Sequence, residues 1–173
     1  MKRIIVSIVA LTAGAATCYS AGLVPYFVGH SSGGKIGWYI EKYNTLKQSG
    51  RPVVIDALCK SSCTAVIAIV PRERICVTKN AILAFHSLAD FGSQVPNQPA
   101  TNYFRSLFSE DIQSWIDKRH ALETLKETYL RGTELEGFVK RCEPTIYNTL
   151  ARPIPTKNDD FENGWTETDA KER

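Results

Sequence analysis

The sequence has little that would bind nucleic acid or cross a membrane. Its 21 lysines and arginines against 18 aspartates and glutamates give a formal charge of only +3, and no basic stripe with interleaved aromatic residues runs along it. It has no internal repeat, and its longest apolar run, residues 4–16, falls short of the roughly 20 residues that a transmembrane helix needs. We therefore expect no nucleic-acid partner and no repeat architecture.

That apolar run has instead the features of a secretory signal peptide. Lys2 and Arg3 precede it and small residues follow it. We expect residues 1–21 to be a leader that directs the protein to the periplasm or otherwise out of the cytoplasm. An uncleaved membrane anchor and a buried first strand are the alternatives.

Beyond the leader the chain keeps an even number of cysteines, namely Cys59, Cys63, Cys76 and Cys142. An even set in an exported chain predicts disulfides, and four cysteines allow three pairings between which the sequence does not choose. We expect at least one disulfide and favour Cys63–Cys76. A zinc site made of Cys59, Cys63, Cys76 and His86 is the alternative, but thiolates compete badly with oxidation outside the cytoplasm. No metal and no cofactor are therefore expected.

The remaining residues predict one α/β domain over 22–152 and a disordered polar tail over 153–173. Short apolar segments alternate with helical patterns, as in a short parallel sheet with flanking helices. The expected strands are 23–28, 52–58, 74–78 and 81–86. The expected helices are 36–46, 64–70, a long one at 101–120 after a polar loop at 90–100, and shorter pieces at 121–130 and 133–141.

Three polar motifs fall at the ends of these strands. They are SSGG at 31–34, the serine pair at 61–62, and His86. In parallel α/β sheets, ligands and chemistry collect at the carboxyl ends of the strands, where turns into helices expose backbone N–H groups. We therefore expect the three loops to converge on one site.

At these motifs the sequence resembles the proteolytic subunit of the Clp protease and its crotonase-fold relatives. SSGG is followed by CKSSCT, and His86 in AFH comes 25 residues after Ser61. The segment PRERICVT is similar to exported Clp-protease-like proteins of alphaproteobacterial type. The likeness spans roughly residues 23–142 and implies a layered Clp-protease/crotonase-like fold. Only about ten residues separate the leader from SSGG, so we expect this fold to be abbreviated at its N-terminus.

The resemblance implies a serine hydrolase site, most plausibly that of a peptidase. Ser61 matches the nucleophile and His86 the general base. The backbone N–H of Ser62 matches one oxyanion donor, and Gly33 or Gly34 the second. A serine hydroxyl needs such a base because it is a poor nucleophile near neutral pH.

The third catalytic residue is less defined. Glu134, in LRGTEL, matches the position of the family's acid, and a solvated helix charge is the other interpretation of it. Asp111 and Asp117 are weaker candidates. Lys60 could form a dyad with Ser61, but side chains of neighbouring residues point apart.

Two functions are compatible with these motifs. The first is an exported hydrolase that acts on a peptide or protein through an acyl-enzyme. The second is a catalytically inactive crotonase-fold module for binding or assembly, held by disulfides. The sequence does not decide whether the protein forms a homo-oligomer. No membrane contact is expected beyond an uncleaved leader.

Overall fold

The computed structural model describes residues 23–90 and 92–143. The expected leader at 1–21 and the expected tail at 153–173 therefore lie outside the described residues. None of the described helices is long and apolar enough to cross a membrane.

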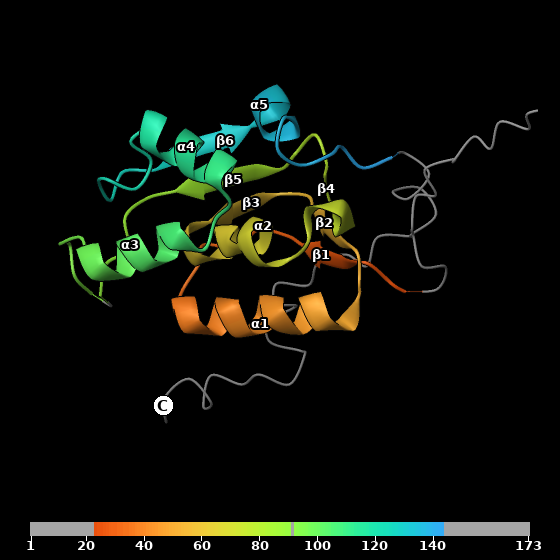
Figure 1. Ribbon diagram of the computed structural model, residues 1–173, viewed down its shortest axis with the longest axis horizontal. Helices are drawn as coiled ribbons and strands as arrows, with labels where there is room; N and C mark the ends of the chain where they lie inside the picture. The colour runs from red at the N-terminus through yellow and green to blue at the C-terminus, as the bar shows by residue number, and fades with distance from the viewer. Residues whose placement is uncertain (1–22, 91, 144–173) are drawn as a thin grey trace, which may run out of the picture.

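Two small sheets form the centre of the α/β domain (Figure 1). The first is fully parallel and has the order β1-β2-β4, with β1 at Tyr26–Val28, β2 at Val53–Ile55 and β4 at Ile75–Val77. The second is mixed and has the order β3-β5-β6, with β3 at Leu58–Lys60, β5 at Ile82–Phe85 and β6 at Thr128–Arg131. Strand β5 runs parallel to β3 and antiparallel to β6.

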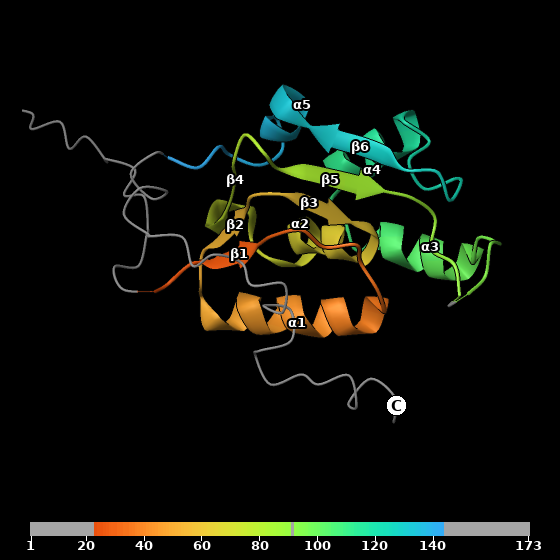
Figure 2. The ribbon, with the colours of Figure 1, turned by 180° about the vertical axis from the view of Figure 1, so that it is seen from behind.

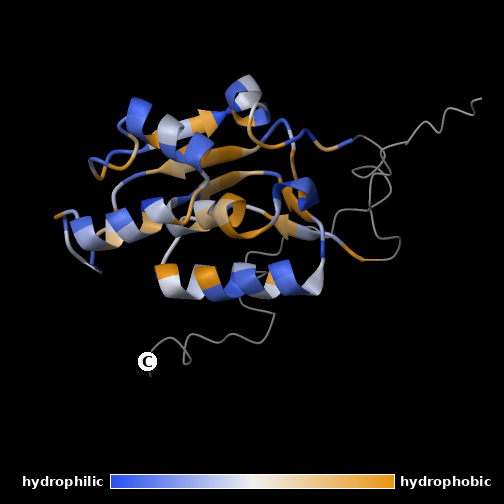
Figure 3. Ribbon diagram, in the orientation of Figure 1, coloured by the Kyte–Doolittle hydropathy of each residue, from blue (hydrophilic) through white to orange (hydrophobic). Residues whose placement is uncertain are grey.

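The strands form the centre of the apolar core, and the helices pack further buried side chains against them. Every residue of β2 and β4 is buried, as expected of parallel strands covered on both faces. Figure 3 shows the strands as mainly hydrophobic and the outer turns of the helices as mainly hydrophilic. The α/β class expected from the alternating pattern is confirmed at this level.

Helices flank the sheets. The first, α1 at Ile36–Ser49, ends at Gly50, whose left-handed φ of 72° suits a helix C-terminus. A 3-10 turn, η1 at Ser61–Ala65, continues into α2 at Val66–Ile69, and a second 3-10 turn, η2, covers Arg72–Arg74. The later helices are α3 at Gln98–Ser106, α4 at Glu110–Lys118 and α5 at Gly132–Glu136.

Several expected element boundaries are wrong. The strand expected at 52–58 is divided at Asp56, where the chain passes from the first sheet to the second. The Asp56 carboxylate accepts a hydrogen bond from Thr78 Oγ1 at 2.6 Å, so the polar side chain at this bend has a partner. The single helix expected at 101–120 is two helices, α3 and α4. Asn97 caps α3 by accepting from the Ala100 N–H at 3.0 Å, so that helix begins inside the expected loop.

The helix expected at 121–130 is also wrong, because its last three residues belong to β6. Leu130 of this strand is buried, whereas Tyr129 and Arg131 on either side of it are exposed. This alternation is the two-residue period of a half-buried strand, and pairing with β5 overrides the local helical pattern.

The disulfides join different cysteines from those favoured by the sequence. Cys59 is bonded to Cys63, and Cys76 is bonded to Cys142. Cys142 reaches β4 because its N–H donates to the Val77 carbonyl at 3.0 Å, beside the strand that carries Cys76. The favoured Cys63–Cys76 pairing is therefore wrong, while the expectation of at least one disulfide is confirmed.

Candidate active site

Ser61 occupies a strained turn between a strand and a helical segment. It follows β3 directly and is the first residue of η1. Its φ is 56°, in the left-handed region that residues with a side chain seldom adopt, and it is 8% exposed. The Cys59–Cys63 disulfide joins the two ends of this turn. Strain of this kind gathers at functional sites, where the surrounding structure holds it in place.

The glycine loop lies directly against Ser61. Ser31 bridges β3 like an added parallel strand: its N–H donates to the Leu58 carbonyl at 2.8 Å, and its carbonyl accepts from the Lys60 N–H at 2.9 Å. This pairing carries Gly33 so close to the serine turn that a Cβ there would lie 2.7 Å from Ser61 Cβ. Gly33 also has a φ of 82°. Only glycine satisfies both conditions.

The side chain of Ser62 holds the glycine loop in place. Its hydroxyl donates to the Gly34 carbonyl at 2.6 Å. Among the described residues, neither the Ser62 N–H nor the Gly34 N–H has an acceptor, whereas the Gly33 N–H makes a long contact of 3.4 Å to Ser31 Oγ. Two unpaired N–H groups thus flank the Ser61 turn, and an oxyanion could accept from both.

His86 follows β5, the strand beside β3. Lys60 pairs with Ala84 in the parallel register, so Ser61 and His86 come at the carboxyl ends of neighbouring strands. His86 Nδ1 lies 2.7 Å from the Ser87 carbonyl oxygen. A carbonyl only accepts, so Nδ1 carries a proton, and in the neutral imidazole Nε2 then keeps the lone pair that a general base requires. The described residues show no hydrogen bond between Ser61 Oγ and His86.

Ser87 has an unusual environment next to this histidine. Its hydroxyl is buried and has no hydrogen-bond partner among the described residues. Its N–H donates to the Thr124 carbonyl at 2.8 Å. The backbone of Ser87 therefore orients His86 and ties it to the segment that precedes β6.

Glu134 does not lie with Ser61 and His86. Its carboxylate accepts from Trp115 Nε1 at 2.9 Å and pairs with Arg119 at 3.1 Å. It follows Arg131, which is paired with Ile82 at the start of β5, whereas His86 is beyond the other end of that strand. Asp111 and Asp117 are held elsewhere, by Arg72 and Arg105.

Glu127 is the carboxylate on the side of His86. It precedes Thr128, whose partner across the ladder is Phe85, so it lies across from His86. Glu127 forms an ion pair with Lys60 and accepts a hydrogen bond from Tyr129 at 2.5 Å. The Lys60 hydrogen bond, with Tyr129 and the charge of His86 contributing, lowers the pKa of Glu127 below its usual value.

Sequence reasoning missed Glu127 because it placed residues 121–130 on a helix. The one signal that points to it is the alternation in TYLR, which fits a strand but is only four residues long; a strand there puts the preceding glutamate at the strand end. Lys60 is occupied by this glutamate, which agrees with the expectation that it forms no dyad with Ser61.

The four residues of the alternative zinc site do not form a metal site. Cys59, Cys63 and Cys76 are all in disulfides, so none is available as a thiolate. In the described part of the chain, no group of three or more potential ligands is placed to hold a metal ion.

Comparison with known proteins gives only distant likenesses. No known protein family and no curated protein matches the sequence. A crystal structure described only as that of an enzyme has 12% identity and a TM-score of 0.43, over 69% of this chain and 77% of the other. The crystal structure of a peptidase from Plasmodium falciparum has 11% identity and a TM-score of 0.44, over 71% of this chain and 79% of the other. The chain is thus similar at a distance to an enzyme and to a peptidase.

Proposed function

We propose that the protein is an exported serine hydrolase, a peptidase of the Clp-protease-like, crotonase-type class. The observation that carries this proposal is the left-handed Ser61 at the end of β3, beside the strand that ends at His86. A strained strand-to-helix turn exposes a serine hydroxyl to a substrate and aims the N–H of the next residue at the same place.

The mechanism uses groups that surround this turn. Ser61 Oγ attacks the scissile carbonyl while His86 Nε2 takes its proton, and the proton then passes to the leaving amine. The tetrahedral oxyanion accepts hydrogen bonds from the backbone N–H groups of Ser62 and Gly34. Water then hydrolyses the acyl-enzyme by the same sequence of proton transfers.

Glu127 is the acid that we assign to this site in place of Glu134. It lies on the His86 side of the β5–β6 ladder, and its lowered pKa keeps it ionised at neutral pH. A negative charge there stabilises the imidazolium that forms when His86 accepts the proton. The Ser87 carbonyl holds the Nδ1–H tautomer.

The cysteines support the proposed compartment. All four described cysteines are in disulfides, which form and persist in oxidising compartments. Together with the expected leader, the disulfides support the proposal that the protein acts in the periplasm or an equivalent exported location.

A fluorophosphonate probe tests the assignment, because only an activated serine reacts with it. We expect the wild type to be labelled and the Ser61→Ala and His86→Ala variants to lose nearly all labelling. Ser62→Ala keeps its backbone N–H and should still be labelled, although more slowly because the Gly34 loop loses its hydrogen bond. Losing an oxyanion donor itself costs about a hundredfold or more in rate.

A second candidate is a non-catalytic binding module with the same fold. The observation that favours it is that Ser61 Oγ and His86 share no hydrogen bond in the described residues. A folded wild type that the probe never labels would support this candidate. Labelling that survives Ser61→Ala and vanishes in Ser62→Ala would instead move the nucleophile by one residue.

A further inference from the structure

We propose that the free edge of β6 is a docking surface for an acidic polypeptide segment, which adds to the second sheet as an extended strand. This surface lies across β5 from the Ser61 turn, so the proposal does not depend on catalysis by Ser61.

Strand β6 has an unpaired edge. The sheet order is β3-β5-β6, and among the described residues β6 has backbone partners only on β5. Figure 2 shows β3, β5 and β6 side by side, with β6 on the outside. Outward N–H and C=O groups on an edge strand form a template for another extended chain.

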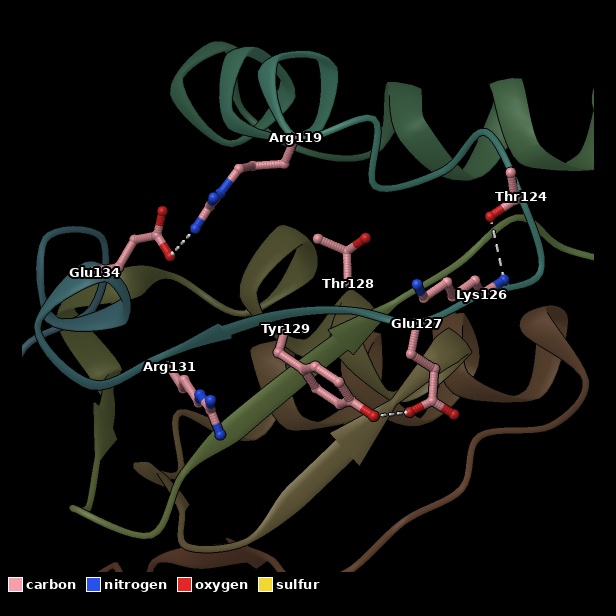
Figure 4. Close-up of a pocket in the computed structure, with 8 residues that line it drawn as sticks. All are labelled: Arg119, Thr124, Lys126, Glu127, Thr128, Tyr129, Arg131 and Glu134. Atoms are coloured by element: carbon pink, nitrogen blue, oxygen red, sulfur yellow. Dashed lines mark hydrogen bonds and ion pairs between the residues drawn. The ribbon is translucent and has the colours of Figure 1, made fainter.

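The charges beside this edge are mainly positive. Residues of β6 and its neighbours line an open hollow of about 600 Å³ (Figure 4). Each of its two carboxylates already has an ion-pair partner, Lys60 for Glu127 and Arg119 for Glu134. Lys126 and Arg131 also line the hollow, and neither has a carboxylate partner in the described part of the chain. The surface therefore keeps two cations available for a ligand.

The placement of these cations fits an extended acidic segment. Figure 4 shows Lys126 and Arg131 on either side of Tyr129, which is 45% exposed. Carboxylates near both ends of a strand-length segment would meet the two cations, while its backbone pairs with β6. A basic segment would be repelled at both ends.

The test is binding of fluorescein-labelled peptides of about eight residues, an ordinary strand length, to the full chain carrying Ser61→Ala. One peptide carries glutamates near both ends of a threonine- and valine-rich centre, and a second carries lysines at the same places. We expect only the acidic peptide to raise the fluorescence anisotropy. Lys126→Glu with Arg131→Glu should weaken it about tenfold, since each reversal replaces an attraction by a repulsion.

Three controls decide the interpretation. Lys47→Glu, a single reversal on α1, should leave the affinity unchanged, whereas Arg131→Glu alone should lower it. An acidic peptide with N-methyl groups on alternate amides keeps its charge but loses its strand-pairing donors, so equal binding by that peptide would overturn strand addition. Equal binding by the lysine peptide would overturn the charge argument.

The chain itself offers a competing occupant, because residues 158–173 contain six acidic residues. A full-length variant with those six replaced by their amides separates the two cases. If the acidic peptide binds only to that variant, the chain's own tail is the occupant and the proposal of a separate partner is wrong. Binding of similar strength to both proteins supports the proposal.

Discussion

At the scale of single residues, Gly33 is where the candidate site leaves the least freedom. It lies against the carbonyl of Lys60 and the Cβ of Ser61, and its backbone is in the left-handed region. A side chain at this position would push the glycine loop away from the serine turn. The unpaired N–H of Gly34 would move with it.

We expect Gly33→Ala to lower the free energy of unfolding by at least about 2 kcal/mol, from the left-handed backbone together with the clash. Probe labelling of the folded fraction should also fall. Gly37→Ala is the matched control, because a Cβ there meets no atom within 4 Å and the residue lies in α1. It should be neutral or stabilise the protein by about 0.5 kcal/mol. Urea unfolding of both variants measures the difference, and equal stabilities would contradict the expected clash.

The short polar motifs that contain glycine, serine and histidine were the part of the candidate site that the sequence predicted best. The SSGG and SS motifs and His86 were expected at strand ends, and the structure places them at or beside the ends of β1, β3 and β5. A short polar motif between two apolar segments marks the end of a strand, so its place in the fold can be predicted from the sequence. The carboxylate that we propose as the acid was not predictable in this way, because Glu127 precedes β6, Glu134 follows it in α5, and the strand between them was not recognised.

At the scale of elements, β6 links the candidate site to the rest of the second sheet. It brings Glu127 to Lys60 across β5 and leaves Tyr129 and Arg131 exposed along its edge. The sequence did not reveal it because four residues are too few for a firm periodic signal. The division between α3 and α4 was also not predictable. Ile112, Trp115 and Ile116 keep the helical apolar spacing of the preceding residues, so the pattern shows no break between the two helices.

The Lys60–Glu127 ion pair should make stability depend on pH. Because the folded-state pKa of Glu127 lies below its ordinary 4.5, the pair contributes fully above that value. The contribution is lost as the pH falls through the lowered folded-state pKa. We expect Lys60→Met to destabilise the protein by about 1 kcal/mol or less at pH 7, as for other partly exposed pairs, and the difference from wild type to vanish in strong acid.

Chemical denaturation at a series of pH values measures this difference. Lys126→Met is the control, because Lys126 is next to Glu127 in the sequence but forms no ion pair in the described residues. A Lys60→Met effect that stays constant down to strong acid would show that the loss comes from packing of the lysine stem.

At the scale of the whole molecule, the two disulfides constrain the chain very differently. Cys76–Cys142 spans 66 residues and ties the end of the described chain to β4, whereas Cys59–Cys63 spans four. Loop-closure entropy predicts that the long bridge stabilises the fold by about 4 kcal/mol and the short one by about 2 kcal/mol. The Cys76–Cys142 pairing could not be predicted from the sequence, because it depends on how the chain returns to β4 after α5.

We therefore expect Cys76→Ala with Cys142→Ala to lower the melting temperature more than Cys59→Ala with Cys63→Ala. Probe labelling should instead fall more in the Cys59→Ala, Cys63→Ala variant, because the short bridge holds the turn that contains Ser61. Calorimetry and labelling of the two double variants measure both effects. A short-bridge variant that is labelled as fast as the wild type would mean that packing alone maintains the turn.

The Cys59–Cys63 disulfide also makes the geometry of the serine turn depend on whether the chain has reached an oxidising compartment. Cytoplasmic thiols are kept reduced, so if the protein is exported, as proposed, a newly made chain has no covalent link across the strained serine until it leaves the cytoplasm. If Ser61 is the nucleophile, oxidation does for this protein what removal of a propeptide does for a zymogen. Under the proposed function, the hydrolase matures only after export, and the proteins of the cytoplasm in which it is made are spared without a separate inhibitor.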